Sequence, residues 1–105
     1  MSDCTVTFVT CASQEEAEKI AETLVRERLA ACVNIVPAVT SIYFWQGSLC
    51  KETERLLVIK STLLKQEQLQ SRVRALHSYT VPEIVSWPLP LGNPDYLRWV
   101  EESTR

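Results

Sequence analysis

The sequence contains only two glycines, Gly47 and Gly92, and a single histidine, His77. Two isolated glycines can form neither a P-loop nor the G-x-G-x-x-G turn of a dinucleotide-binding fold. One histidine cannot supply the two or three histidines of a catalytic zinc site, and no G-x-S-x-G motif is present. Since the common catalytic motifs are missing, we predict that the protein is not an enzyme and has no catalytic residues.

The four cysteines are widely spaced and include no Cys-x-x-Cys pair. Their positions, Cys4, Cys11, Cys32 and Cys50, do not support a zinc ribbon or a thioredoxin-like redox site. Nothing in the chain indicates an oxidising compartment, so a disulfide framework is not expected. We predict that the cysteines are mostly buried as small apolar residues.

Runs of charged or apolar residues are also missing. No three basic residues are consecutive and the net charge is -2, so we predict no nucleic-acid partner. No apolar stretch approaches the roughly 18 residues of a membrane span, and the first residues do not resemble a signal peptide. We therefore expect no membrane association and a cytoplasmic location. The 105 residues, 46% of them hydrophobic, predict one domain over residues 1–105.

What the chain does contain is an unusually long uncharged segment over residues 32–45. As a strand it would be about 45 Å long. A domain of this size is only about 35 Å across, so the strand must extend beyond its own fold. Its end carries Tyr43, Phe44 and Trp45, whose large rings a monomer cannot easily bury. We predict that another copy of the chain covers them.

The first half of the chain predicts two further elements. Alternating apolar residues predict a strand over 5–10, and apolar residues at helical spacing predict a helix over 14–31. Ser13 and Glu16 form a capping-box pattern at the start of that helix.

The middle of the chain is predicted to form a hairpin. Pro37 lacks a backbone donor, so it predicts a bulge or an edge position in the long strand. Gly47 lies in a predicted turn over 46–51. The continuous apolar run within the next strand, over 52–60, predicts burial on both faces.

The last third predicts a helix, a strand and a second helix. Thr62 is placed to cap a helix that ends near His77, and a strand follows over 83–87. Asn93 and Pro94 form the cap and first position of a short terminal helix. The order βαββαβ plus a helix predicts an α+β, ferredoxin-like split β-α-β sandwich, in which two helices cover one face of a four-stranded sheet.

Four segments, together with Glu54 and Lys60, carry motifs over nearly the whole chain. The segments are LAACVNI at 29–35, SIYFWQG at 41–47, HSYTVPEI at 77–84 and GNPDYLRW at 92–99. In these motifs the chain resembles the CutA family of divalent-cation tolerance proteins. The resemblance implies a ferredoxin-like subunit in a tight, PII-like homotrimer whose long hairpins extend over neighbouring subunits.

The resemblance also implies a function and candidate metal ligands. The implied function is divalent metal (copper) tolerance by binding, with copper or another divalent ion as ligand and no required cofactor. The family's first-strand cysteine aligns with Val9, and its histidine pair is reduced to Leu76 and His77. Cys11 shares a strand face with Val9, so His77 and Cys11 are the predicted ligands, His77 as an accessible residue at a helix end. The alternative is that His77 only complements the carbonyl end of its helix.

A second candidate site follows from the family motifs. Five polar and aromatic residues are predicted to line a cleft between subunits that holds a small anionic or zwitterionic ligand, or else to form an interfacial network. They are Trp45, Glu54, Lys60, Tyr79 and Glu83. The short hairpin turn and the lack of a glycine cradle disfavour ATP sensing. The alternative function is a PII-like structural or signalling trimer that binds a small metabolite or a partner protein in these clefts.

Overall fold

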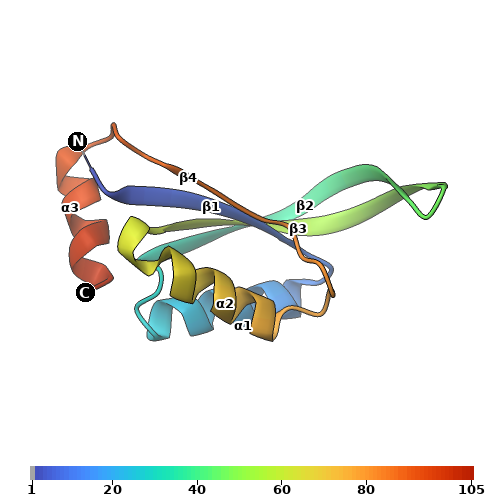
Figure 1. The fold of residues 1–105 in the computed structure, drawn as a ribbon, viewed down its shortest axis with the longest axis horizontal. Coiled ribbons are helices and arrows are strands. Elements are labelled where there is room, and N and C mark those ends of the chain that lie inside the picture. Colours follow the sequence, from blue (N-terminus) through green and yellow to red (C-terminus); the bar gives the residue numbers. More distant parts are fainter. Residues whose placement is uncertain (1) are drawn as a thin grey trace.

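A computed structural model describes residues 2–105 as a four-stranded antiparallel sheet with two helices on one face and a third helix at one end (Figure 1). The strand order is β2-β3-β1-β4, which confirms the predicted ferredoxin-like α+β fold. The elements are β1 (Cys4–Cys11), α1 (Gln14–Arg26), β2 (Cys32–Trp45), β3 (Ser48–Thr62), a 3-10 turn (Leu63–Lys65), α2 (Gln66–Leu76), β4 (Ile84–Pro88) and α3 (Pro94–Ser103). Of the helices within residues 2–105, none is both long and apolar enough to cross a membrane.

The β2–β3 hairpin extends well past the helices, as predicted (Figure 1). The molecule is 45 Å along its longest axis but only 25 and 23 Å along the others. The turn consists of Gln46 and Gly47 alone, at φ values of 50° and 81°. Two left-handed residues match the type I′ turn that suits the twist of a hairpin. The predicted turn over 46–51 was therefore too long, because residues 48–51 already pair with β2.

Pro37 produces the predicted irregularity in β2. The pairing register shifts between Val36 and Val39, so Pro37 and Ala38 together oppose the single residue Arg55. Two residues opposite one define a β-bulge, and β2 is an edge strand of the sheet. The missing donor of Pro37 is tolerated at such a position.

Helix α1 begins as predicted and ends earlier. The Ser13 hydroxyl accepts a hydrogen bond from the Glu16 backbone N–H at 3.2 Å, which confirms the cap. The helix stops at Arg26 instead of residue 31, because Arg28 takes a left-handed φ of 59°. The following residues, Leu29 to Ala31, are buried without being helical, so their apolar pattern imitated a longer helix.

The second half of the fold differs from prediction in small ways. The Thr62 side chain makes no capping bond, because a 3-10 turn separates it from α2. Helix α2 ends at Leu76 with His77 as its C-cap residue, and β4 lies one residue later than predicted. The side chain of Asn93 accepts the backbone N–H of Asp95 at 3.0 Å, which confirms the cap of α3.

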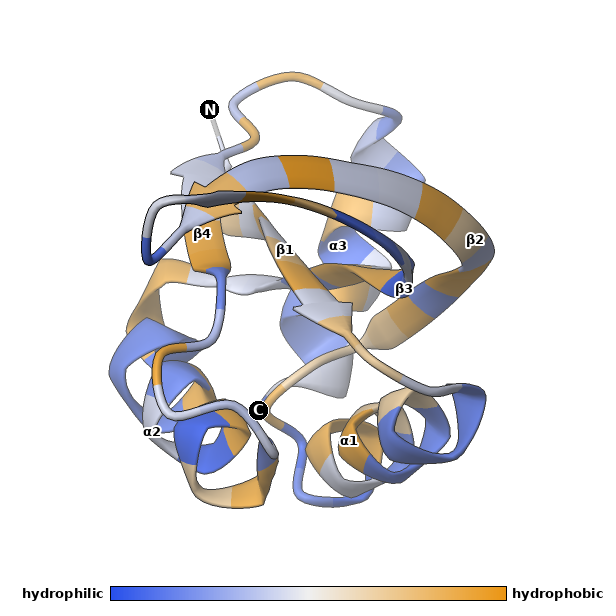
Figure 2. Ribbon diagram, turned by 90° about the vertical axis from the view of Figure 1, so that its right-hand side faces the viewer, coloured by the Kyte–Doolittle hydropathy of each residue, from blue (hydrophilic) through white to orange (hydrophobic). Residues whose placement is uncertain are grey.

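The main core lies between the sheet and the pair α1 and α2, which lie side by side on one face (Figure 2). Leu57 and Ile59 of β3 are fully buried there, whereas Leu56 and Val58 on the opposite face are only half-buried. The predicted burial of β3 on both faces was therefore wrong within one chain. Helix α3 covers part of the second face, around Cys4 and Leu97.

We call this second face the open face. Because side chains alternate along a strand and the strands are in register, its members follow from the pairing. The apolar members away from α3 are Val6, Phe8, Leu56, Val58, Val85 and Trp87. Within this set the rings of Phe8 and Trp87 meet edge to face, with centroids 4.8 Å apart.

The cysteines follow the prediction in part. Cys4 and Cys11 are buried, whereas Cys32 and Cys50 are half-buried, and all four are free thiols.

Candidate functional site

Glu54 and Tyr79 meet where the hairpin leaves the body of the molecule. The Glu54 side chain belongs to β3 and is only 7% exposed. The hydroxyl of Tyr79, in the loop after α2, donates a hydrogen bond to Glu54 Oε2 at 2.7 Å. Burial and this bond to the carboxylate raise the pKa of Tyr79. The phenol is therefore a permanent donor to Glu54 at neutral pH.

A second tyrosine–carboxylate pair lies next to the first, farther along the hairpin. The Tyr43 hydroxyl donates to Glu52 Oε1, and this bond raises the pKa of Tyr43 to about 12. Glu52 and Glu54 are two residues apart on one face of β3, and the negative charge of Glu52 also helps to raise the pKa of Tyr79. We call Tyr43, Glu52, Glu54 and Tyr79 the tyrosine–carboxylate cluster.

The cluster is acidic and lacks a counter-charge within the chain. No Lys, Arg or His nitrogen lies within 4.0 Å of Glu52 or Glu54 across the described residues. Both phenols stay protonated near neutral pH, so the cluster combines two phenol hydroxyls with two carboxylates. Tyr43 and Glu52 were not predicted from the sequence, although the spacing of Glu52 and Glu54 along one strand was a usable signal.

The other three residues of the predicted cleft lie elsewhere in a single chain. Lys60 is six residues beyond Glu54 along β3, which corresponds to about 20 Å. Trp45 is paired with Ser48 at the opposite end of the hairpin, and Glu83 is exposed just before β4. Within the described residues, Glu54 and Tyr79 are the pair of the five joined by a hydrogen bond, so a five-residue cleft needs more than one subunit and stays a prediction.

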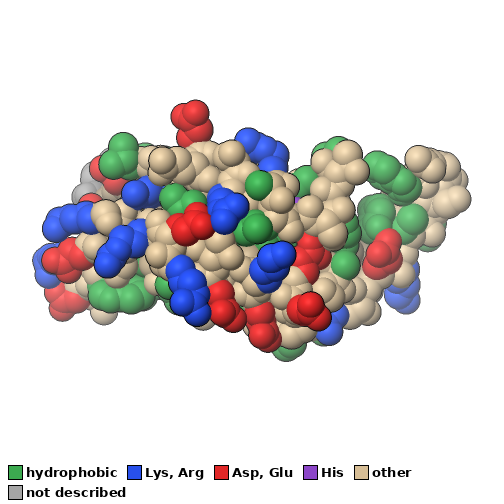
Figure 3. Space-filling view, turned by 90° about the horizontal axis from the view of Figure 1, so that it is seen from below, with side chains coloured by type: hydrophobic (Ala, Val, Ile, Leu, Met, Phe, Trp, Pro, Cys, Tyr) green, Lys and Arg blue, Asp and Glu red, His purple; other side chains and the backbone are tan. Residues whose placement is uncertain are grey.

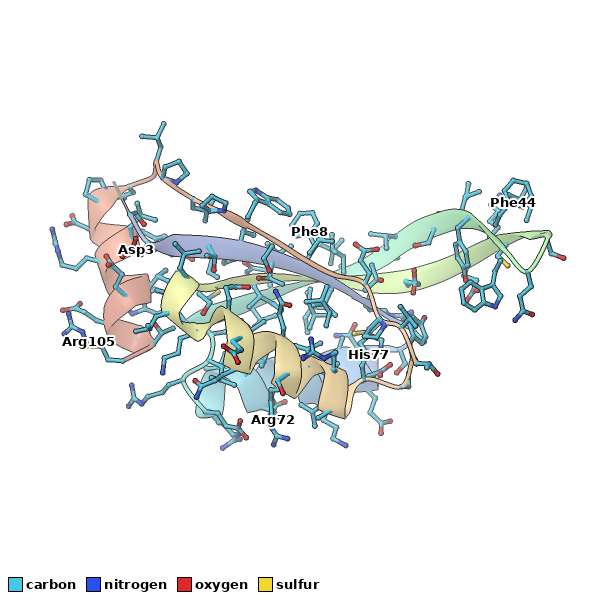
Figure 4. All side chains as sticks on the ribbon, in the orientation of Figure 1. Asp3, Phe8, Phe44, Arg72, His77 and Arg105 are labelled. Atoms are coloured by element: carbon cyan, nitrogen blue, oxygen red, sulfur yellow. The ribbon has the colours of Figure 1, made fainter. Side chains whose placement is uncertain are left out.

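His77 is buried, not accessible as predicted. Its side chain has no exposed surface and lies beneath the strands at the end of α2 (Figure 4). Nε2 lies 2.7 Å from the Thr10 carbonyl oxygen, and Nδ1 accepts the Tyr79 backbone N–H at 3.1 Å. Because a carbonyl can only accept, these partners require a proton on Nε2 and the free lone pair on Nδ1. Both nitrogens are already used within the fold.

Glu16 of α1 holds the loop that follows His77. Its carboxylate accepts the backbone N–H of Ser78 at 2.6 Å and the Ser78 hydroxyl at 3.1 Å. The same carboxylate lies 3.6 Å from His77 Nδ1. The start of the loop is thus held at two adjacent residues, Ser78 to α1 and Tyr79 to β3.

Cys11 is fully buried in the core, as is Val9, while Leu76 packs against that core. Burial raises the pKa of Cys11 to about 12, and the carboxylates of Glu16 and Glu54 add to the rise. Copper and zinc bind the thiolate, which this environment disfavours. Throughout residues 2–105 no three His, Cys, Asp or Glu residues are grouped to hold a metal ion. As folded, His77 and Cys11 therefore do not fit a copper site in a single chain.

The outer, helical face carries many charged side chains (Figure 3). Acidic and basic side chains are interspersed over it (Figure 3). A groove of about 1010 Å³ beside α2 contains the two-pronged ion pair of Arg72 and Glu27, whose closest atoms are 2.9 Å apart. Arg72 and Glu27 satisfy one another, and Lys65, Glu67 and Gln68 also line the groove.

Comparison with known proteins agrees with the fold. The family model described as CutA1 divalent ion tolerance protein matches residues 5–103. The divalent-cation tolerance protein CutA of Thermus thermophilus is 54% identical over 94% of this chain and 96% of its own. The chloroplastic protein CutA of Arabidopsis thaliana is 43% identical over 95% of this chain, which spans 55% of that relative. A solved Thermus thermophilus CutA1 structure superposes with a TM-score of 0.94 at 52% identity, covering 97% of this chain and 99% of its own.

Proposed function

Because the chain belongs to the CutA family of divalent-ion tolerance proteins, we propose that it works as a homotrimer that binds its ligand between subunits. Family members carry the name of tolerance proteins and not of enzymes. The observation that carries the proposal is the hairpin, which presents large apolar side chains on both of its faces that no described residue of the chain covers.

The exposure of the hairpin end supports assembly. Phe44 is 74% exposed and its cross-strand partner Leu49 is 66% exposed, while Trp45 on the other face is 60% exposed. No charged side chain occurs between Cys32 and Cys50. A contiguous apolar surface of this kind marks an interaction site, and the apolar open face of another copy is a matching partner.

The free edges of the sheet support a cyclic arrangement. The edge strands are β2 and β4, and the antiparallel pairings make them run in opposite directions. The β2 edge of one subunit can therefore continue the antiparallel ladder of a neighbour at β4. Such head-to-tail contacts close into a ring, and three is the subunit number that the family resemblance implies.

Light scattering at micromolar concentration tests the assembly. We expect a mass of three times the 12.0 kDa chain. A mass equal to one chain would refute it.

Direct copper binding through His77 and Cys11 is the finer question, and the geometry does not favour it. An anaerobic copper titration of the parent, His77→Ala and Cys11→Ser is the test. Equal affinities are expected, because both side chains are buried and His77 is already hydrogen-bonded. A loss in either variant would show that the loop after α2 opens to admit the metal.

The second candidate function is a trimer that binds a small metabolite or a partner protein in the intersubunit clefts. The tyrosine–carboxylate cluster favours it, since Glu54 is buried without a counter-charge in the described chain. Crystals soaked in a metabolite mixture would show density between subunits. We also propose a cytoplasmic location for this protein. Family membership alone does not decide the location, because the Arabidopsis relative is named as chloroplastic.

A further inference from the structure

Lys60 lies on the open face without a negative partner. It stands between Val6 of β1 and Cys32 of β2 in the pairing register, and its ammonium donates a hydrogen bond to the Asn34 side-chain oxygen. No carboxylate oxygen lies within 4.0 Å of its Nζ in the part of the chain that the structure describes. Lys60 is half-buried beside an apolar surface.

The side chains around Lys60 are hydrogen-bond donors. The Asn34 oxygen faces Lys60 and also lies 4.0 Å from the Cys32 sulfur, so its amide group keeps two donors for other partners. The Cys32 thiol lies near Tyr96 of α3, and burial, followed by the effect of Cys32, raises the pKa of Tyr96. We call Lys60, Asn34, Cys32 and Tyr96 the donor cluster.

We propose that the donor cluster binds a small oxyanion, a phosphate or a carboxylate, which a neighbouring subunit encloses when it covers the open face. The inference rests on the proposed trimer, because the cluster is open to solvent on one side in a single chain. An oxyanion accepts from an ammonium and an amide N–H at once, and such charge-assisted bonds are strong in a dry site. It also supplies the missing negative charge at Lys60.

The site differs from the predicted five-residue cleft. Of those five residues only Lys60 belongs to it, and the nearer carboxylate of the tyrosine–carboxylate cluster, Glu54, lies about 20 Å away along β3. The acidic cluster repels an anion, whereas the donor cluster contains no acidic side chain. The open surface thus has one end that suits anions and another that suits cations.

Calorimetric titration with inorganic phosphate, and separately with acetate, tests the proposal at a constant ionic strength set by chloride. The parent should show saturable binding at no more than one anion per chain. Lys60→Met keeps the apolar stem and removes the charge. It should weaken anion binding at least about tenfold, because it removes one hydrogen bond from a charged donor. Lys19→Met, which removes an exposed charge from α1, is the matched control and should bind like the parent. Tighter binding of phosphate or of acetate identifies which oxyanion the site prefers.

Light scattering on the same samples separates this proposal from the assembly. A trimeric parent without saturable binding, or equal binding by Lys60→Met, overturns the anion site and leaves the trimer intact. The anion site is also overturned if the Lys60→Met variant dissociates and the parent binds no anion. In that case a carboxylate of the neighbouring subunit would be the counter-charge of Lys60. A parent of one-chain mass refutes the trimer and the enclosure that depends on it.

Discussion

At the scale of single residues, the Tyr79 hydroxyl is the one hydrogen-bond donor to the buried Glu54 carboxylate within the described residues. Tyr79→Phe removes that donor and leaves a buried charged group unsatisfied. We expect it to lower the free energy of unfolding by about 1–3 kcal/mol in urea denaturation.

Tyr43→Phe is the matched control, because it removes the same group from the solvent-exposed Tyr43–Glu52 pair. In this variant we expect a change within about 0.5 kcal/mol. Equal losses in both variants would show that burial of Glu54 does not set the cost.

Cys11 gives a pH-dependent prediction. Its pKa rises from 9.0 to about 12 because the thiol is buried near Glu16 and Glu54. A raised pKa in the fold means that the neutral thiol stabilises the native state fully below pH 9, and that this contribution is lost as pH rises from 9 toward 12. The parent should therefore lose more stability than Cys11→Ala between pH 8 and about 10.5.

Urea denaturation at a series of pH values measures this difference. Alkylation adds an independent check, since Cys11 should react with iodoacetamide far more slowly than the half-buried Cys50 at pH 8. Parallel pH profiles for parent and variant would contradict the assignment of the shift to Cys11.

At the scale of elements, the end of α1 depends on one left-handed residue. Arg28 has a φ of 59°, a conformation that costs a residue with a Cβ about 1 kcal/mol more than glycine. Arg28→Gly should therefore raise the free energy of unfolding by up to about 1 kcal/mol. Thermal or urea denaturation measures the change.

Arg26→Gly is the matched control, because it makes the same substitution two residues before Arg28. Arg26 is the last helical residue of α1, and Gly there should destabilise by about 1 kcal/mol. Opposite signs are the expected result, and destabilisation by both would show that Arg28 makes a contribution that outweighs its backbone conformation.

The beginnings of α1 and α3 were predictable because they depend on local chemistry, whereas Thr62 does not cap α2. Ser13 and Asn93 cap α1 and α3 as their sequence neighbourhoods indicate, and Pro37 marks the bulge. The end of α1 was not predictable, because Leu29–Ala31 continue the apolar pattern of the helix without being helical. This segment is held to β3 by a hydrogen bond from the Ala31 N–H to the Lys60 carbonyl oxygen at 2.9 Å.

The candidate site was less predictable, because long-range contacts create it. The sequence motifs included Glu54 and Tyr79, which meet across 25 residues. They did not indicate that His77 would be buried, since its partner is a backbone carbonyl 67 residues away. A backbone acceptor has no sequence signature, so the chemistry of His77 depended on the tertiary fold.

At the scale of the whole molecule, the hairpin is the part whose stability a single chain does not explain. Two strands that project from a domain with apolar side chains on both faces gain little from their own contacts. In a trimer each hairpin would be held by a neighbour, so its order and the assembly would be lost together.

Trp45→Ala tests that coupling. Large aromatic anchors contribute most to interfaces, so we expect the variant to lose at least about 2 kcal/mol of assembly free energy per interface and to dissociate on dilution at concentrations where the parent stays trimeric. Trp99→Ala is the matched control, because Trp99 of α3 is also partly exposed at 46% but lies at the opposite end of the molecule, against Tyr96. Its effect should fall on the melting temperature of the subunit more than on the dilution profile. A Trp45 variant with the mass and melting temperature of the parent would mean that the hairpin end lies outside the interface. The contacts that hold the trimer together would then have to come from the open face and the β2 and β4 edges alone.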